Sequence, residues 1–162
     1  MPTLWAIFID ASIFLHHAFD VNPDSVEFLK RVESNDLKAY TSALVIEEIT
    51  FKLMMQSASN FLEKITLQSV KTFLKDDENR EKVFKPVEEY REYINYLKDF
   101  GFTILDLTDR DMALAIQKAR AYGLITADAA HIAIMERKGI THIASSDSDF
   151  KAVSNITLWS PD

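Results

Sequence analysis

Residues 4–12 read Leu-Trp-Ala-Ile-Phe-Ile-Asp-Ala-Ser, a short apolar run that ends at an acid. The run is rich in β-branched and aromatic residues and is far too short to span a membrane, so it predicts a buried β-strand. Asp10 closes this strand, and a helical pattern follows it directly. We therefore expect Asp10 at the carboxyl edge of a sheet, where open α/β folds bind their ligands.

Four more short apolar runs resemble the first, and longer helical patterns separate them. The predicted strands cover residues 4–9, 39–42, 103–107, 142–145 and 156–159. The predicted helices cover residues 12–19, 24–34, 43–57, 60–76, 82–99, 109–122 and 127–138. Because parallel neighbours need a crossover connection, this alternation predicts a three-layer α/β/α fold. Its central sheet would be mostly parallel, with about five strands.

Few residues interrupt these elements. Gly101, Gly123 and Gly139 fall where a helix should stop, so we expect them to be C-caps, and Asp24, Thr108 and Thr126 are usable N-caps. The densely charged segment 60–100 is helical in pattern and predicts a helical hairpin inserted in the domain. A length of 162 residues suits one core, so we expect a single domain over residues 1–162.

Composition excludes several classes of protein. The chain has no cysteine, which excludes disulfides, thiolate nucleophiles and Cys-based zinc sites and fits a reducing cytoplasm. We find no export signal and no membrane segment. The formal net charge of -7 argues against nucleic-acid binding through a basic surface, unless several acids surround a divalent cation.

A second predicted strand also delivers acids to the carboxyl edge. Residues 143–150 read Ile-Ala-Ser-Ser-Asp-Ser-Asp-Phe, so Asp147 and Asp149 follow the strand at 142–145. Each acid also has a structural interpretation. Asp10 can simply cap the helix that follows it, and Asp147 and Asp149 suit a surface turn.

Two helices carry the remaining candidate acids. Asp128 lies in the first turn of a helix, where the helix dipole favours an acid, but its small apolar neighbours point to a packed environment. Glu47 and Glu48 are adjacent helical residues about 100° apart, so at most one faces a site, and periodicity does not decide which. Either one alone suits a solvated helix surface.

The four histidines do not have the spacing of a zinc site. His131 follows Asp128 by three residues on the same helix face, which places it near any site that includes Asp128. We expect a hydrogen-bonded core or orienting role for it rather than a catalytic one.

In chain order, four segments together resemble the motifs of PIN-domain nucleases of the toxin type, similar to VapC ribonucleases. They are Asp10-Ala11-Ser12, the helix start from Ser42 to Glu48, Gly123-Leu124 with Asp128-Ala129-Ala130-His131, and Ser145 to Phe150. The resemblance implies that Asp10, Glu48, Asp128 and Asp147 are catalytic and bind the metal, with Ser12, Ser145 and Asp149 in support. It favours Glu48 over Glu47 because the family's acid falls six residues after the position of Ser42.

The implied activity is a metal-dependent endonuclease that hydrolyses phosphodiester bonds of single-stranded or structured RNA. Clustered carboxylates stay ionised together only beside a cation, and oxygen ligands suit Mg²⁺ or Mn²⁺. The resemblance also implies a cytoplasmic toxin, a homodimer and an antitoxin partner. Available basic residues are Lys52, Lys71, Lys75, Arg80, Lys82, Arg120, Arg137 and Lys138.

Two other functions stay open on the sequence. One is a catalytically silent or inhibited binding domain that keeps the fold. The other is a Mg²⁺-dependent phosphatase of the haloacid-dehalogenase type, although such enzymes want a second acid two residues after the first, where Ser12 stands.

Overall fold

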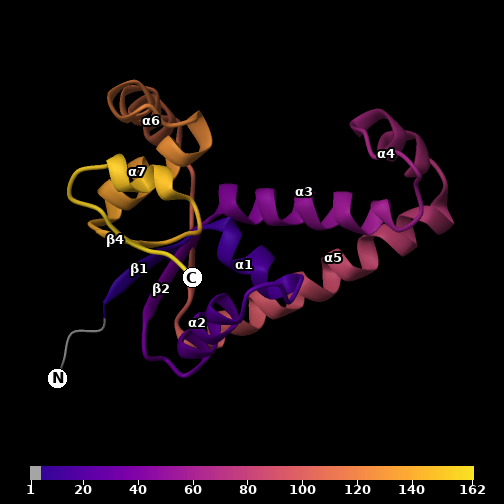
Figure 1. Ribbon diagram of the computed structural model, residues 1–162, viewed down its shortest axis with the longest axis horizontal. Helices are drawn as coiled ribbons and strands as arrows, with labels where there is room; N and C mark the ends of the chain where they lie inside the picture. Colours follow the sequence, from indigo (N-terminus) through magenta and orange to yellow (C-terminus); the bar gives the residue numbers. More distant parts are fainter. Residues whose placement is uncertain (1–4) are drawn as a thin grey trace.

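A computed structural model describes residues 5–162, and its centre is a five-stranded parallel sheet (Figure 1). The strands pair in the order β3-β2-β1-β4-β5. They are β1 (Ala6–Ile9), β2 (Lys38–Ser42), β3 (Thr103–Leu105), β4 (His142–Ala144) and β5 (Thr157–Trp159). The predicted strands and their parallel arrangement are confirmed, and the predicted start of the first strand at residue 4 lies outside the described residues.

Helices cover both faces of the sheet. They are α1 (Ala11–Ala18), α2 (Pro23–Glu33), α3 (Ala43–Ser59), α4 (Leu67–Phe73), α5 (Asp77–Leu97), α6 (Asp109–Tyr122) and α7 (Thr126–Lys138), with short 3₁₀ turns η1 (Lys98–Phe100) and η2 (Ser148–Ala152). Figure 1 shows α6 and α7 above the strands, with α1 and α2 on the other side, to the right and lower right. The predicted three-layer α/β/α architecture is therefore confirmed.

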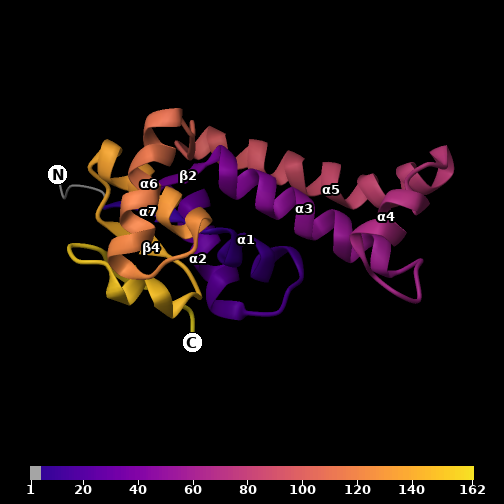
Figure 2. The ribbon, with the colours of Figure 1, turned by 90° about the horizontal axis from the view of Figure 1, so that it is seen from above.

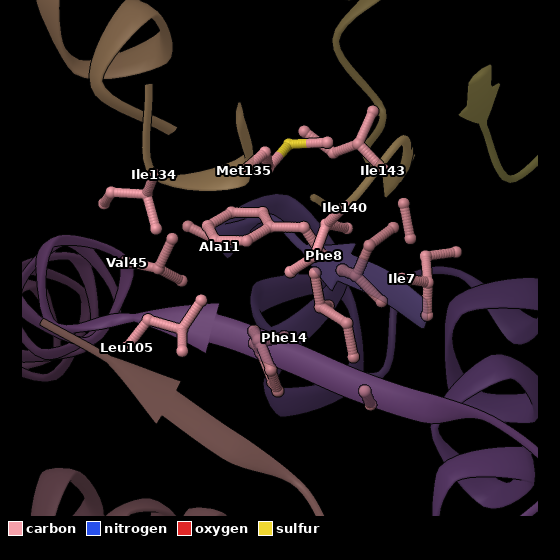
Figure 3. Close-up of a cluster of buried hydrophobic side chains, with 14 of the residues drawn as sticks. Ile7, Phe8, Ala11, Phe14, Val45, Leu105, Ile134, Met135, Ile140 and Ile143 are labelled. Carbon is pink, nitrogen blue, oxygen red and sulfur yellow. The ribbon is translucent and has the colours of Figure 1, made fainter. Parts of the chain in front are cut away.

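The main core surrounds β1, which is buried on both faces. Figure 3 shows side chains from several layers gathered there, including Phe8 of β1, Phe14 of α1 and Met135 of α7. Phe8 also lies against the imidazole of His131, with ring centroids 5.4 Å apart. Because interior packing leaves little freedom, the residues at the end of β1 are held in a fixed position.

A long arm extends away from the sheet (Figures 1 and 2). It consists of α3 packed along α5, with α4 at the outer end. The predicted helix over residues 60–76 is wrong in its first half, because α4 begins only after Thr66, whose side chain and Ser69 form a reciprocal cap. The outer end of the arm has a small separate core that contains Ala58, Val70 and Val83. The antiparallel partner of α5 is thus mainly α3, not the segment that follows it.

A proline in the middle of α5 is accommodated by a contact from α3. Pro86 has no N–H to donate to the carbonyl of Lys82, four residues earlier. The hydroxyl of Ser57 donates to that carbonyl instead, at 3.5 Å. The contact joins the two long helices where the ladder of α5 is interrupted.

Several predicted helix ends are confirmed, whereas α5 begins at Asp77, earlier than the predicted residue 82. Gly101, Gly123 and Gly139 adopt left-handed conformations that end helices, and Thr108 caps α6. Neither Asp24 nor Thr126 is a cap, because Asn22 caps α2 and Ile125 occupies the N-cap position of α7. Among the helices of residues 5–162, none combines the length and apolar character that a membrane span requires.

Candidate metal centre

Asp10 lies at the carboxyl end of β1 and is largely buried, with 8% of its surface exposed. Its Oδ2 accepts hydrogen bonds from the hydroxyls of Ser12 and Ser145, both at 2.7 Å. It also accepts a longer bond of 3.4 Å from the backbone N–H of Ser12, so Asp10 does cap α1. Oδ1 accepts no hydrogen bond from residues 5–162. Capping therefore uses one carboxylate oxygen and leaves the other free.

The same two serines tie the ends of β1 and β4 together. Ser12 Oγ accepts from the backbone N–H of Ser146, and Ser145 Oγ accepts from that of Asp147, both at 3.0 Å. The side chain of Asp147 accepts in turn from the backbone N–H of Asp149, and Asp147 thereby caps η2. Because β1 and β4 are neighbours in the sheet, this network holds Asp147 near Asp10. Asp149 is exposed at the margin.

Helix α3 brings Glu48 to this edge. The helix begins directly after β2, where the Ser42 hydroxyl accepts from the N–H of Val45. Glu48, in the second turn, offers a carboxylate oxygen close to Asp10 and His131, and the three donor atoms lie within 4.8 Å of one another. Glu47 is exposed and is not in this group.

His131 is the residue that departs most from expectation. It is fully buried on α7, and its Nε2 lies 3.9 Å from Asp10 Oδ1. Neither ring nitrogen has a hydrogen-bond partner among the described residues, so the expected hydrogen-bonded role is wrong. Burial lowers the pKa of His131, although Asp10 and Glu48 oppose this shift. The imidazole is therefore neutral, with a lone pair available at one nitrogen.

Asp128 occupies the first turn of α7, one turn before His131. Its pKa is raised to about 6, first by burial and then by the negative charges of Asp10, Asp147, Glu48 and Asp149. All the predicted acids therefore repel Asp128 across this edge of the sheet. Lys52, which pairs with Glu48 one turn further along α3, is a cation at the margin.

This donor set fits a divalent ion. Carboxylate oxygens of Asp10 and Glu48 converge from two elements, one oxygen of Asp10 is free, and a buried neutral imidazole lies beside it with no partner in the described chain. A cation would relieve the repulsion that raises the pKa of Asp128. In the sequence, the i, i+3 spacing from Asp128 placed His131 near the site, and Lys52 was among the available basic residues. Neither the free imidazole nor the pairing of Lys52 with Glu48 was predicted.

A profile of the PIN domain matches residues 7–156, which is most of the chain. The chain belongs to the PIN-domain family. PIN domains are nucleases, and this assignment removes the phosphatase alternative. Among curated proteins, no sequence matches this chain.

Solved structures share the whole PIN fold at low sequence identity. A chain of VapBC2 from Rickettsia felis, crystallised with a promoter DNA fragment, is 11% identical with a TM-score of 0.61, covering 97% of this chain and 99% of that one. A chain of a toxin–antitoxin complex from Klebsiella pneumoniae is 12% identical with a TM-score of 0.61, covering 93% and 95%.

VapC20 of Mycobacterium tuberculosis, described as a toxin that cleaves the sarcin–ricin loop, is also similar. It is 17% identical with a TM-score of 0.60, and the match covers 91% of this chain and 95% of VapC20. At such identities the likeness confirms the PIN fold over nearly the full length of this chain.

Proposed function

We propose that this PIN domain is a divalent-metal-dependent endoribonuclease. Asp10, Glu48, Asp128 and Asp147 hold the ion, and Ser12, Ser145 and Asp149 support them. The observation that carries the proposal is the buried Asp10 carboxylate, which has a free oxygen and several acidic neighbours but no Lys or Arg ion pair within residues 5–162. A buried charge cluster of this kind needs a counter-ion, and oxygen-rich sites suit Mg²⁺ or Mn²⁺.

When bound, such an ion would polarise a phosphodiester and lower the pKa of an attacking water. The chain itself performs the positioning. Ser12 and Ser145 fix the carboxylate of Asp10 so that Oδ1 turns toward Glu48 and His131. Asp128, with a pKa raised to about 6 in the metal-free protein, would ionise fully once a cation offset its acidic neighbours, so that it could join them as a ligand.

RNA contacts are expected to come from a few residues around the acids. Lys52 is the best placed of the basic residues, because it lies one turn beyond Glu48 with half of its side chain exposed. Arg137 is already engaged by Asp111 and the carbonyl of Asp106, so we do not assign it to substrate. A flexible single strand or a loop can reach an acidic pocket more readily than a continuous duplex.

A partner protein is part of the proposal. Two of the similar structures are toxin–antitoxin complexes, which supports an antitoxin for this chain as well. The outer end of the arm exposes Phe61, Ile65 and Leu67, an apolar group suited to such a contact. A homodimer is also proposed, and sedimentation of the chain alone and with its partner would distinguish the two assemblies.

The test is cleavage of end-labelled single-stranded and stem-loop RNA by purified protein with Mn²⁺ or Mg²⁺. Asp10→Ala removes the central carboxylate, and we expect the rate to fall more than about 100-fold, with EDTA abolishing cleavage. Asp109→Asn changes an exposed acid on α6 and serves as the matched control. Absence of cleavage of every RNA by metal-loaded protein would favour the inhibited binding domain instead.

A further inference from the structure

Within the described chain, nothing explains why the imidazole of His131 is buried beside the acidic cluster. It is fully buried, yet neither ring nitrogen has a hydrogen-bond partner within residues 5–162. The other histidines are different, because Nδ1 of each lies within hydrogen-bond distance of a hydroxyl: His16 with Ser25, His17 with Tyr90 and His142 with Thr141. Buried polar groups are rarely left without partners, so His131 calls for a ligand.

The geometry shows where that ligand would lie. Nε2 of His131 is 3.9 Å from Asp10 Oδ1, which is too far for a direct hydrogen bond. Two donors that each lie about 2.1 Å from one ion can be at most about 4.2 Å apart. The separation therefore suits a shared ion. Glu48 supplies a third donor atom within 4.8 Å of the other two, so only a small closure around the ion is needed.

The surrounding contacts keep these donors in place. Oδ2 of Asp10 is taken by the two serine hydroxyls, which leaves Oδ1 as the donor. The ring of His131 packs against Phe8 in the main core, so it has little freedom to turn elsewhere. The imidazole is thus fixed in the orientation that presents Nε2 to Asp10.

We propose that His131 is a direct ligand of the metal through Nε2, and that this nitrogen makes the centre prefer a transition-metal ion such as Mn²⁺ over Mg²⁺. The inference rests on the proposed metal dependence. Mg²⁺ is a hard ion that takes oxygen ligands, whereas imidazole nitrogen suits first-row transition metals. A donor set that adds one imidazole to the carboxylates therefore discriminates between the two ions in a way that acids alone do not.

The test is electron spin-echo envelope modulation on the Mn²⁺-loaded full chain, with occupancy established by a binding isotherm. We expect ¹⁴N modulation from a directly bound imidazole in the natural protein. Labelling histidine with ¹⁵N should replace it by the ¹⁵N pattern. This measurement needs no substitution, so it does not depend on the folding of a variant.

His131→Gln should abolish the modulation, lower Mn²⁺ affinity at least about tenfold and lower Mg²⁺ affinity less. His142→Gln, at the opposite end of β4, is the matched control and should leave the spectrum unchanged. Bound Mn²⁺ without histidine nitrogen coupling would overturn the assignment of His131 while leaving the acid site standing. Failure to bind Mn²⁺ at all would overturn both the assignment and the proposed metal dependence.

Discussion

Asp10 and Asp111 are both buried aspartates at the start of a helix, but they are compensated in different ways. Each accepts a hydrogen bond from a nearby hydroxyl, Ser145 at 2.7 Å and Thr108 at 2.8 Å. Asp111 also accepts two bonds from the guanidinium of Arg137, at 2.8 and 2.9 Å. Asp10 faces acids and a neutral imidazole instead.

The pKa values express the same contrast. The hydrogen bonds from Arg137, ahead of the opposing effect of burial, lower the pKa of Asp111 to about 2. At the other site, burial and neighbouring acids raise the pKa of Asp128 to about 6. A buried charge needs compensation. The chain supplies it for Asp111, which is structural, and we infer that a bound ion supplies it around Asp10.

The largest effect on stability is expected from removing the built-in counter-charge. Arg137→Met leaves Asp111 buried without its cation and should lower the free energy of unfolding by about 2 kcal/mol at pH 7. The loss is smaller than for a fully buried ion pair, because Arg137 is partly exposed to solvent. Urea unfolding measures this. Arg120→Met, an exposed arginine on α6, should change stability by less than about 0.5 kcal/mol.

The pH dependence gives a second check on that pair. The folded-state pKa of Asp111 lies below its unfolded value, so its stabilising contribution is complete above about pH 4 and is lost as the pH falls toward 2. The difference between Arg137→Met and the natural protein should shrink over that range. An unchanged difference at low pH would mean that the ion pair is not its cause.

Asp128→Asn should change the free energy of unfolding in the opposite direction and stabilise the metal-free protein. The folded-state pKa of Asp128 is raised, so the stability that it contributes below about pH 4 is lost as the pH rises through about 6. With EDTA at pH 7, Asp128→Asn should therefore raise the free energy of unfolding by about 1 kcal/mol, allowing for solvent screening. Thermal unfolding between pH 4 and 7 measures the change.

Asp109→Asn is the matched control for this variant, because Asp109 is an exposed acid in the first turn of the neighbouring helix. Asp109→Asn removes the same kind of favourable interaction with a helix dipole, but Asp109 is not repelled by the acidic cluster. The substitution should therefore lower stability by a few tenths of a kcal/mol. Equal effects of the two variants would contradict the repulsion around Asp10.

A third pair of variants separates the roles of the hydroxyls of Thr108 and Ser145. Thr108→Ala removes a cap and should lower stability by about 1 kcal/mol without changing Mn²⁺ affinity. Ser145→Ala releases Asp10 Oδ2 and should weaken Mn²⁺ binding about tenfold. Calorimetric titration of both proteins is the measurement, and similar affinities would argue that Ser145 does not orient the carboxylate for an ion.

The strands and most helices were predictable because local patterns determine them. Short β-branched runs gave the five strands, and glycines at helix ends gave their limits. The start of α4 was missed because residues 60–66 have helix-forming character and only the Thr66 cap interrupts it. The sequence therefore indicated the α/β layers better than the arm, whose shape depends on α3 packing along α5.

The candidate site was predictable only in part. Acids that follow neighbouring parallel strands must meet at one edge, which placed Asp10 and Asp147. The position of Glu48 relative to Glu47 depends on the orientation of α3, which periodicity left open. The lack of a partner for His131 within residues 5–162 is a property of three-dimensional packing, so no sequence pattern could reveal it.

The most direct test of the central claim is calorimetric titration of Mn²⁺ into the natural protein and into Asp10→Asn, followed by thermal unfolding of each. The natural protein should bind Mn²⁺, and at 100 times the dissociation constant it should gain about 2.7 kcal/mol of stability. Asp10→Asn should show neither binding nor stabilisation at that concentration. Absence of Mn²⁺ binding by the natural protein, or equal binding by the variant, would contradict the inference that an ion compensates Asp10.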